Sequence, residues 1–392
     1  TKAIELNPTY ADAYFNRGNC KISTDNYKSA IDDYTKTIQI NSEYADAYYN
    51  RGLCKHILQN YKDAIEDYSI AIKLEPTNHS YYLSRAKVQR ATENYTAAIQ
   101  DYIKVIELNP KSVDAYFYRG LSKKKLDDYN GAIEDYTKAI ELDPNYISAY
   151  YNRGICKRHF NNYKGAIEDY TKAIELDPKH VNAYYNRGNC KKRTEDYKGA
   201  IDDYTQAISL DSKNVDAYCN RGSTKYILDD YKSAIEDFNK AIELEPKNNL
   251  AYKGRGYAEF ELKEYEAAIK DYTKAIEIDP NQAIVYYNRG RSEAQLQNYK
   301  DAANDYTKAI ELKPDYYLAY YRRGTVKFVA KDYEAAIQDY TKAIELNPQY
   351  REAYTERGNA KDKLGLKDAA LADWQKASQL NKKNTDDLSH EN

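Results

Sequence analysis

The sequence contains no methionine, one tryptophan and only five cysteines among 392 residues. An odd and sparse set of cysteines is unlike the disulfide framework of a small secreted domain. No Cys or His residues have the close spacing of a zinc site, so we expect no metal and no cofactor. No apolar run approaches the length of a membrane-spanning helix, and no signal peptide opens the chain. These absences predict a soluble protein in a reducing compartment, which we interpret as the cytoplasm.

Net charge is also nearly absent. Lys and Arg total 59 and Asp and Glu total 61, which gives a formal net charge of -2. A balanced chain has no long-range field that would favour nucleic acid or an anionic membrane. We therefore expect neither as a partner, and any preference for charge must come from local groups of side chains.

What the sequence has instead is a repeat of 34 residues, in which position 1 is defined here by Ile147 and its equivalents. A fixed period of this length indicates stacked units that share one elongated core and present an extended surface. One position, position 8, is glycine in every unit but the third: Gly18, Gly52, Ala86, Gly120, Gly154, Gly188, Gly222, Gly256, Gly290, Gly324 and Gly358.

Each unit has the pattern of a helical hairpin. In residues 147–180, apolar side chains follow helical spacing in two runs. Asn161 and Asn162 form a turn between the runs, and Pro178 closes the second run. Glycine inside a helix lowers stability by roughly 0.5 to 1 kcal/mol relative to Ala. The repeated glycine at position 8 therefore indicates that two helices approach closely there, and we expect the opposing residue to be the alanine at position 20. Tyrosines at positions 4, 17 and 24 are expected to form the core, and the cysteines at position 10 to fill it.

These residues resemble the tetratricopeptide repeat (TPR) family. The resemblance implies an all-α fold, a right-handed superhelical solenoid of antiparallel helix pairs, with the first helices lining a concave groove and the second helices outside. Arg at position 7 and Lys at position 11 depart from the usual family pattern without altering the expected fold. The family's pattern of aromatic, small residue, aromatic, Ala, aromatic, Ala and Pro appears here as Tyr150, Gly154, Tyr163, Ala166, Tyr170, Ala173 and Pro178.

The repeat also predicts the domain organisation. Residues 11–384 are expected to form eleven units in one continuous solenoid. Residues 1–10 copy the end of a unit and are interpreted as the second half of a preceding, truncated repeat. Because methionine is absent as well, we expect this chain to be a piece of a longer protein. Residues 385–392 form a polar tail that is predicted to be disordered.

Two sets of charged residues recur in register. Every unit has Arg at position 7 and Asp at position 23, such as Arg153 and Asp169. A half-buried Arg needs a partner, so we expect a structural ladder of Arg–Asp pairs rather than a row of phosphate-binding arginines. Lys at position 11 often occurs with an acidic residue at position 22, such as Lys157 with Glu168, and this compensation suggests that the two side chains meet.

Position 6 carries asparagine in six units and is expected to face the groove. An amide donates and accepts hydrogen bonds, so a ladder of amides could hold the backbone of an extended peptide. The ladder resembles that in the repeat array of O-linked N-acetylglucosamine transferase, while the alternative is a surface amide bonded to water or to the next repeat. The predicted peptide-binding residues are Asn16, Asn50, Asn152, Asn186, Asn220 and Asn288.

A narrower partner class comes from the same resemblance. Chaperone-binding members of the family hold a C-terminal carboxylate with Lys, Asn and Arg (or Lys) side chains from three successive units. Lys253, Asn288 and Arg322 match that clamp, but Tyr257 and Leu318 stand where Asn and Lys are expected. A partial carboxylate clamp makes a chaperone C-terminus a weaker alternative partner.

The groove positions 9, 12 and 13 change character along the chain. They predict an extended partner with acidic or phosphorylated residues against units three to six and apolar anchors against units seven to ten. The alternative is a solvated basic face with extra packing between repeats. The basic groove residues are Lys87, Arg90, Lys124, Lys125, Arg158, His159, Lys192 and Arg193, and the apolar groove residues are Tyr226, Ile227, Tyr257, Phe260, Phe328 and Val329.

The sequence favours binding over catalysis. The five histidines form no common constellation, and no phosphate-binding loop is present. We predict a non-catalytic protein–protein interaction scaffold that binds an extended peptide in the concave groove. The alternative is the regulatory or substrate-recruiting TPR region of a larger enzyme.

Overall fold

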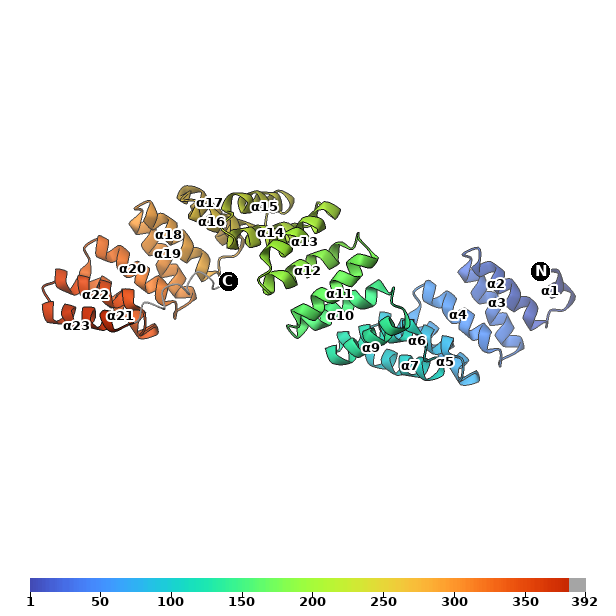
Figure 1. Cartoon of the computed structure of the whole chain (residues 1–392). Coiled ribbons are helices and arrows are strands. Elements are labelled where there is room, and N and C mark those ends of the chain that lie inside the picture. The colour runs from blue at the N-terminus through green and yellow to red at the C-terminus, as the bar shows by residue number, and fades with distance from the viewer. Residues whose placement is uncertain (381–392) are drawn as a thin grey trace. The chain divides into compact units, whose positions relative to one another are not determined.

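The computed structural model describes residues 1–380, and the predicted tail 385–392 lies outside the described residues. After the short helix α1 (Lys2–Leu6), the described chain forms eleven pairs of α-helices, one pair in each repeat (Figure 1). The first helices of the pairs are α2 (Ala11–Ile22), α4 (Ala45–Ile57), α6 (His79–Ala91), α8 (Val113–Lys125), α10 (Ile147–His159), α12 (Val181–Arg193), α14 (Val215–Ile227), α16 (Asn249–Glu261), α18 (Ala283–Gln295), α20 (Tyr317–Val329) and α22 (Arg351–Lys363). The second helices are α3 (Tyr27–Ile40), α5 (Tyr61–Leu74), α7 (Tyr95–Leu108), α9 (Tyr129–Leu142), α11 (Tyr163–Leu176), α13 (Tyr197–Leu210), α15 (Tyr231–Leu244), α17 (Tyr265–Ile278), α19 (Tyr299–Leu312), α21 (Tyr333–Leu346) and α23 (Lys367–Gln379).

The chain divides into two compact units at residue 195, within the sixth repeat. The first unit contains α1 to α12 and the second contains α13 to α23. One continuous solenoid over residues 11–384 therefore stays a prediction. No described helix is both long and apolar enough to cross a membrane. Within the same residues, no three His, Cys, Asp or Glu side chains are placed to hold a metal ion.

The turn between the two helices of a pair has a fixed backbone shape. Position 15 adopts a left-handed conformation in every unit, from Asp25 with φ 57° to Gly365 with φ 77°. Only the last of these residues is glycine, which takes this conformation without strain. In seven units the next residue, Asn or Asp, caps the second helix, as where Asn162 Oδ1 accepts from the Gly165 backbone N–H at 3.1 Å.

The core of each pair is built from the same small set of side chains. Tyr170 at position 24 and the alanines at positions 20 and 27, Ala166 and Ala173, are completely buried. Equivalent residues are buried in the other units, where Phe238 replaces tyrosine in unit seven, but Trp374, which replaces it in unit eleven, is 36% exposed. Full burial of one such ring typically contributes about 3 kcal/mol, so the repeated aromatic dominates each local core.

The glycine at position 8 leaves room mainly for the tyrosine ring at position 24. A Cβ atom on Gly154 would lie 2.8 Å from Cε1 of Tyr170, too close for two carbon atoms. The alanine at position 20, which we expected to be the opposing surface, is the more distant neighbour. A Cβ atom on Gly52 would lie 3.3 Å from the Ala64 carbonyl oxygen but 3.0 Å from the Tyr68 ring. The ring determines the approach because it reaches across the pair, whereas the alanine side chain does not.

The Arg–Asp ladder is confirmed in ten units. Each position-7 guanidinium lies 2.5 to 2.7 Å from the buried Asp at position 23 of its own repeat, as in Arg153–Asp169 at 2.7 Å. In most units the guanidinium also reaches the preceding second helix, as where Arg153 Nη1 donates to Thr137 Oγ1 at 3.0 Å. One side chain thus joins three helices, which the pattern of sequence alone did not predict.

In the seven units whose contacts the structure describes, lysine at position 11 pairs with position 23 rather than with position 22. In seven units its Nζ lies 2.7 to 3.0 Å from the same position-23 Asp, as in Lys157–Asp169 at 2.8 Å. Burial alone would raise the pKa of Asp33, but hydrogen bonds from Arg17 and Lys21 hold it below its usual range. The predicted pairing with position 22 is wrong because position 23 faces the first helix while position 22 points toward solvent.

Position 10 is core only where a complete second helix precedes it. Cys54, Cys156 and Cys190 are fully buried, and Cys54 packs against Ala30 and Tyr34 of the preceding repeat. Cys20 is exposed, contrary to the expectation for this position, because the helix before it, α1, has only five residues.

Candidate binding surface on the first helices

In the first compact unit, positions 5, 6 and 9 of neighbouring first helices lie side by side. Asn50 at position 6 donates from Nδ2 to Oδ1 of Asn19, at position 9 of the preceding unit, at 3.1 Å. Asn186 at position 6 likewise donates to the Tyr151 hydroxyl, at position 5 of the preceding unit, at 3.0 Å. Position 6 of one repeat therefore lies beside positions 5 and 9 of the repeat before it.

The asparagines of this face are partly engaged in bonds within the chain. Nδ2 of Asn152 donates to the Ser148 carbonyl at 2.9 Å, while its Oδ1 accepts from Lys124 Nζ at 2.6 Å. Asn288 is only 6% exposed and differs from the others, because its Oδ1 accepts from Arg291 and its Nδ2 donates to its own helix. Asn16 is exposed. A backbone ligand would have to share or replace these internal bonds.

The basic groove residues differ in how available they are. Lys125, Arg158 and Arg193 are exposed. Lys124 and Lys192 are half-buried, and burial lowers the pKa of each. The other basic groove residues, Lys87, Arg90 and His159, contact neighbouring side chains of the first compact unit.

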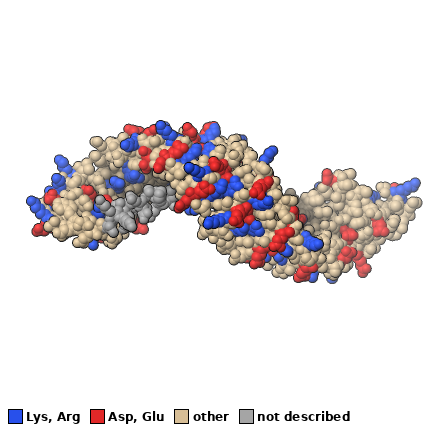
Figure 2. All heavy atoms as spheres, in the orientation of Figure 1, with Lys and Arg blue, Asp and Glu red and all other residues tan. Residues whose placement is uncertain are grey.

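Those contacts are mainly with aromatic rings. Lys87 and Arg90 lie 5.1 and 5.0 Å from the centroid of the Tyr118 ring, and Lys87 Nζ also lies 3.2 Å from Asp114. His159 stacks on Tyr129 at 3.8 Å. On the visible face of the described chain, Lys and Arg alternate with Asp and Glu rather than separating by sign (Figure 2).

The apolar groove residues are more buried than their sequence positions suggest. Phe260 and Phe328, at position 12, pack edge-on against the position-17 tyrosines Tyr265 and Tyr333 at 5.4 Å. Tyr226, Ile227 and Tyr257 are half-buried as well. Only Val329, with 47% of its surface exposed, is an open apolar side chain of this set. Much of the predicted apolar surface thus contributes packing between helices.

The three residues that match the carboxylate clamp are not equally accessible. Asn288 is buried and bonded, as described above. Lys253 is half-buried, and burial lowers its pKa. Arg322 is exposed, and its guanidinium lies 5.6 Å from the centroid of the Tyr321 ring.

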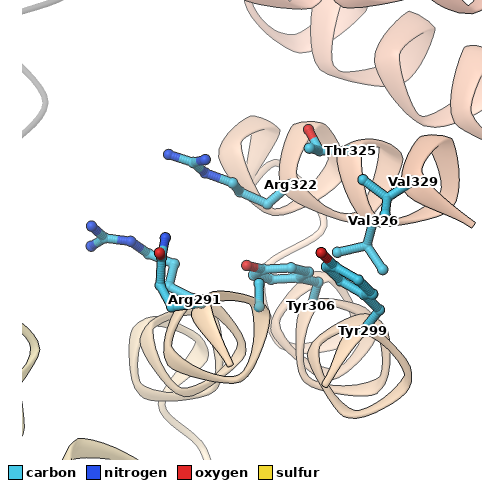
Figure 3. Close-up of a pocket in the computed structure, with 9 residues that line it drawn as sticks. Arg291, Tyr299, Tyr306, Arg322, Thr325, Val326 and Val329 are labelled. Carbon is cyan, nitrogen blue, oxygen red and sulfur yellow. The ribbon is translucent and has the colours of Figure 1, made fainter. Parts of the chain in front are cut away.

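A cavity of about 240 Å³ opens in the second compact unit. Helices α18, α19 and α20 surround it, and Figure 3 shows Arg291 and Arg322 extending to its open side from α18 and α20. Arg291 is not among the site residues predicted from the sequence. The repeat register contains a signal for Arg291, because position 9 of one repeat lies beside position 6 of the next repeat. Only repeats nine and ten place cations at both of these positions. The cavity is lined by Arg291, Ala294, Gln295, Tyr299, Tyr306, Arg322, Thr325, Val326 and Val329.

Comparisons with solved structures found several repeat proteins. YrrB, described as a TPR protein with an unusual peptide-binding site, is 30% identical over 48% of this chain and 96% of its own, with a TM-score of 0.44. The C-terminal part of a TPR repeat-containing protein from Cytophaga hutchinsonii is 23% identical over 60% of this chain and 97% of its own, with a TM-score of 0.53. Yeast Tom70 is 20% identical over 95% of this chain and 92% of its own, with a TM-score of 0.40. No curated protein sequence matched the chain.

Family models match most of the repeats. The model described as TPR repeat matches residues 89–127, 120–155 and 256–292. The model described as Tetratricopeptide repeat matches residues 11–44, 45–78, 147–180, 181–214, 215–248, 283–316 and 317–350, which together exceed half of the chain. With its paired helices and its repeated core, the chain belongs to the tetratricopeptide repeat family.

Proposed function

We propose that this chain is a non-catalytic scaffold that binds an extended segment of a partner protein along the face formed by positions 6, 9 and 13 of its first helices. The observation that carries the proposal is a division of labour within the repeat. Positions 7, 8, 20, 23 and 24 hold nearly constant residues that bond or pack inside each pair, as Arg153, Gly154 and Asp169 do. Positions 6, 9 and 13 vary in residue type from repeat to repeat, so they can differ in what they offer a partner.

The first compact unit, residues 1–195, favours an acidic or phosphorylated partner segment. Its exposed cations Lys125, Arg158 and Arg193 come from three successive first helices, α8, α10 and α12. Cations arranged at repeat spacing raise the local concentration of an acidic ligand and speed its association. The half-buried side chains of Lys124 and Lys192 add to the same positive potential. The net charge of the whole chain is close to zero and gives no general attraction for an acidic ligand.

Charge reversal in the first unit tests this function. The triple variant Lys125→Glu, Arg158→Glu, Arg193→Glu should slow the association of a fluorescein-labelled nine-residue Glu/Leu peptide and flatten its salt dependence. The matched control reverses Lys104, Lys138 and Lys172, which lie on second helices and form exposed ion pairs with Glu107, Glu141 and Glu175. Equal peptide kinetics for the two variants would show that the first helices are not the binding face.

A further inference from the structure

Two arginines of the second compact unit occupy a pair of neighbouring positions that holds two cations nowhere else in the repeat array. Arg291 is at position 9 of unit nine and Arg322 is at position 6 of unit ten. In units one and two the same positions hold Asn19 and Asn50, which share a 3.1 Å hydrogen bond. Two cations at this spacing repel each other, and the repulsion must be offset by something that the neutral pair does not need.

Neither arginine has an acidic partner among the described residues. Arg291 donates from Nη1 to Asn288 Oδ1 at 3.0 Å and lies 4.3 Å from the centroid of the Phe260 ring. Arg322 lies over Tyr321. The neighbouring framework arginines behave differently, because Arg289 and Arg323 each bond an Asp at 2.7 Å.

The side chains around the two guanidinium groups form a cavity with a polar mouth and an apolar wall. The Tyr306 hydroxyl points to the open side toward which both arginines extend (Figure 3). Burial raises the pKa of Tyr306, and the charges of Arg322 and Arg291 oppose that rise, so both guanidinium groups lie near the hydroxyl. Val326 and Val329 form the apolar wall of the same cavity.

We propose that this Arg291–Arg322 pocket binds the carboxylate of an acidic residue in a partner segment, with an adjacent apolar side chain against Val326 and Val329. A carboxylate presents two oxygens to guanidinium donors and cancels the repulsion between the two cations. Two cations beside an apolar wall do not suit a nucleic-acid strand, which needs a row of backbone contacts. The inference rests on the proposed function, since it assigns one residue of the segment to one pocket.

The first test needs no ligand. In the free protein, Arg291→Gln with Arg322→Gln should leave the melting temperature unchanged or raise it, because repulsion is removed and no ion pair is lost. The matched pair Arg289→Gln with Arg323→Gln should lower it, since the first change leaves buried Asp305 without its arginine and the second leaves buried Asp339 with Lys327 alone. A fall in melting temperature for Arg291→Gln with Arg322→Gln would mean that the two arginines serve the fold, and the pocket proposal would be wrong.

The second test measures recognition by fluorescence anisotropy. The probe is an end-blocked seven-residue peptide with a central Glu between Leu residues, made also with Gln or phosphoserine at the centre. The wild-type chain should bind the Glu peptide about tenfold more tightly than the Gln peptide, and Arg291→Gln with Arg322→Gln should remove the difference. Lys308→Gln with Lys342→Gln, which neutralises two exposed lysines of the second helices, should retain it.

The other outcomes separate the two proposals. Equal affinity of the wild-type chain for the Glu and Gln peptides would overturn the pocket, while groove binding itself would stand. A preference for phosphoserine with no preference for Glu over Gln would replace the carboxylate by a phosphorylated residue and overturn the proposal as stated. Failure of every version to bind at millimolar peptide would contradict the pocket and the proposed function together.

Discussion

At the scale of single residues, the repeated tyrosine at position 24 depends on the residue at position 9. Where position 9 is polar, it can bond the ring's hydroxyl, as where Tyr34 donates to Asn19 Oδ1 at 2.7 Å. Where position 9 is Leu121 or Ile155, the buried hydroxyls of Tyr136 and Tyr170 have no hydrogen-bond partner. A buried hydroxyl without a partner loses its bonds to water and gains none in return.

Removing such a hydroxyl should therefore stabilise the protein. Tyr136→Phe is expected to raise the free energy of unfolding by about 1 kcal/mol in urea denaturation. Phe238 shows that the site accepts phenylalanine, since it is 1% exposed at the equivalent position of unit seven. Tyr34→Phe, which removes a hydrogen-bonded hydroxyl, should lower the free energy of unfolding by a similar amount. Destabilisation by both changes would show that the Tyr136 hydroxyl has a partner after all.

Glu259 is the residue that fits its environment least well. It occupies position 11, where seven other units pair a lysine with the buried Asp at position 23, and it is only 8% exposed. Burial raises the pKa of Glu259 to about 8, and the nearby Asp271 carboxylate adds to the rise. Arg255 Nε, 3.8 Å from Glu259 Oε1, offsets only part of it, because it also bonds Asp271 at 2.5 Å.

This carboxyl predicts a specific pH dependence of stability. The folded chain retains the Glu259 proton up to about pH 8, whereas an unfolded Glu releases it near pH ~4.3. Stability should therefore fall as pH rises between these values. Glu259→Gln should be more stable than wild type by about 1 kcal/mol or more at pH 8, with the difference shrinking toward pH 5. Parallel stability curves for wild type and Glu259→Gln would contradict this, and Glu261→Gln, an exposed neighbour, is the control.

At the scale of the helix pair, the turn between helices combines one backbone conformation with many residue types. Gly365 has φ 77°, and a Cβ atom there would meet nothing within 4 Å. Gly365→Ala should thus isolate the cost of the left-handed conformation, about 1 kcal/mol in urea denaturation. Lys331→Gly, at the same position of unit ten with φ 64°, should relieve that strain and be neutral or stabilising. A neutral Gly365→Ala would show that the turn can relax.

Sequence periodicity predicted the helix pairs but not the direction of individual side chains. Apolar spacing places Tyr163 and Tyr170 correctly, because a core residue must face the partner helix wherever the backbone goes. Charge compensation misplaced Lys157, since adjacent positions 22 and 23 differ by only 100° around a helix and covariation cannot separate them. The cavity beside Arg291 was missed for a related reason, because it is formed by residues from two successive repeats.

At the scale of the whole molecule, one set of ion pairs recurs in both compact units and links neighbouring helix pairs within each of them. Asp169→Asn leaves Arg153 and Lys157 without their shared carboxylate and should lower the free energy of unfolding by about 3 kcal/mol. Because these groups lie beneath the binding face, peptide affinity at a temperature where the variant is folded should not change. Loss of affinity with unchanged stability would assign the ladder to the ligand instead.

The proposed function requires that the first helices bind the partner and that the second helices do not. The most direct measurement is photo-crosslinking of the nine-residue Glu/Leu peptide, carrying a benzophenone side chain, followed by mass spectrometry of the cross-linked sites. Cross-links are expected at positions 6, 9 and 13 of the first helices, such as Asn152, Ile155 and His159 on α10. Cross-links on the outward residues of second helices, such as Lys172 and Glu175 on α11, would contradict the proposed function.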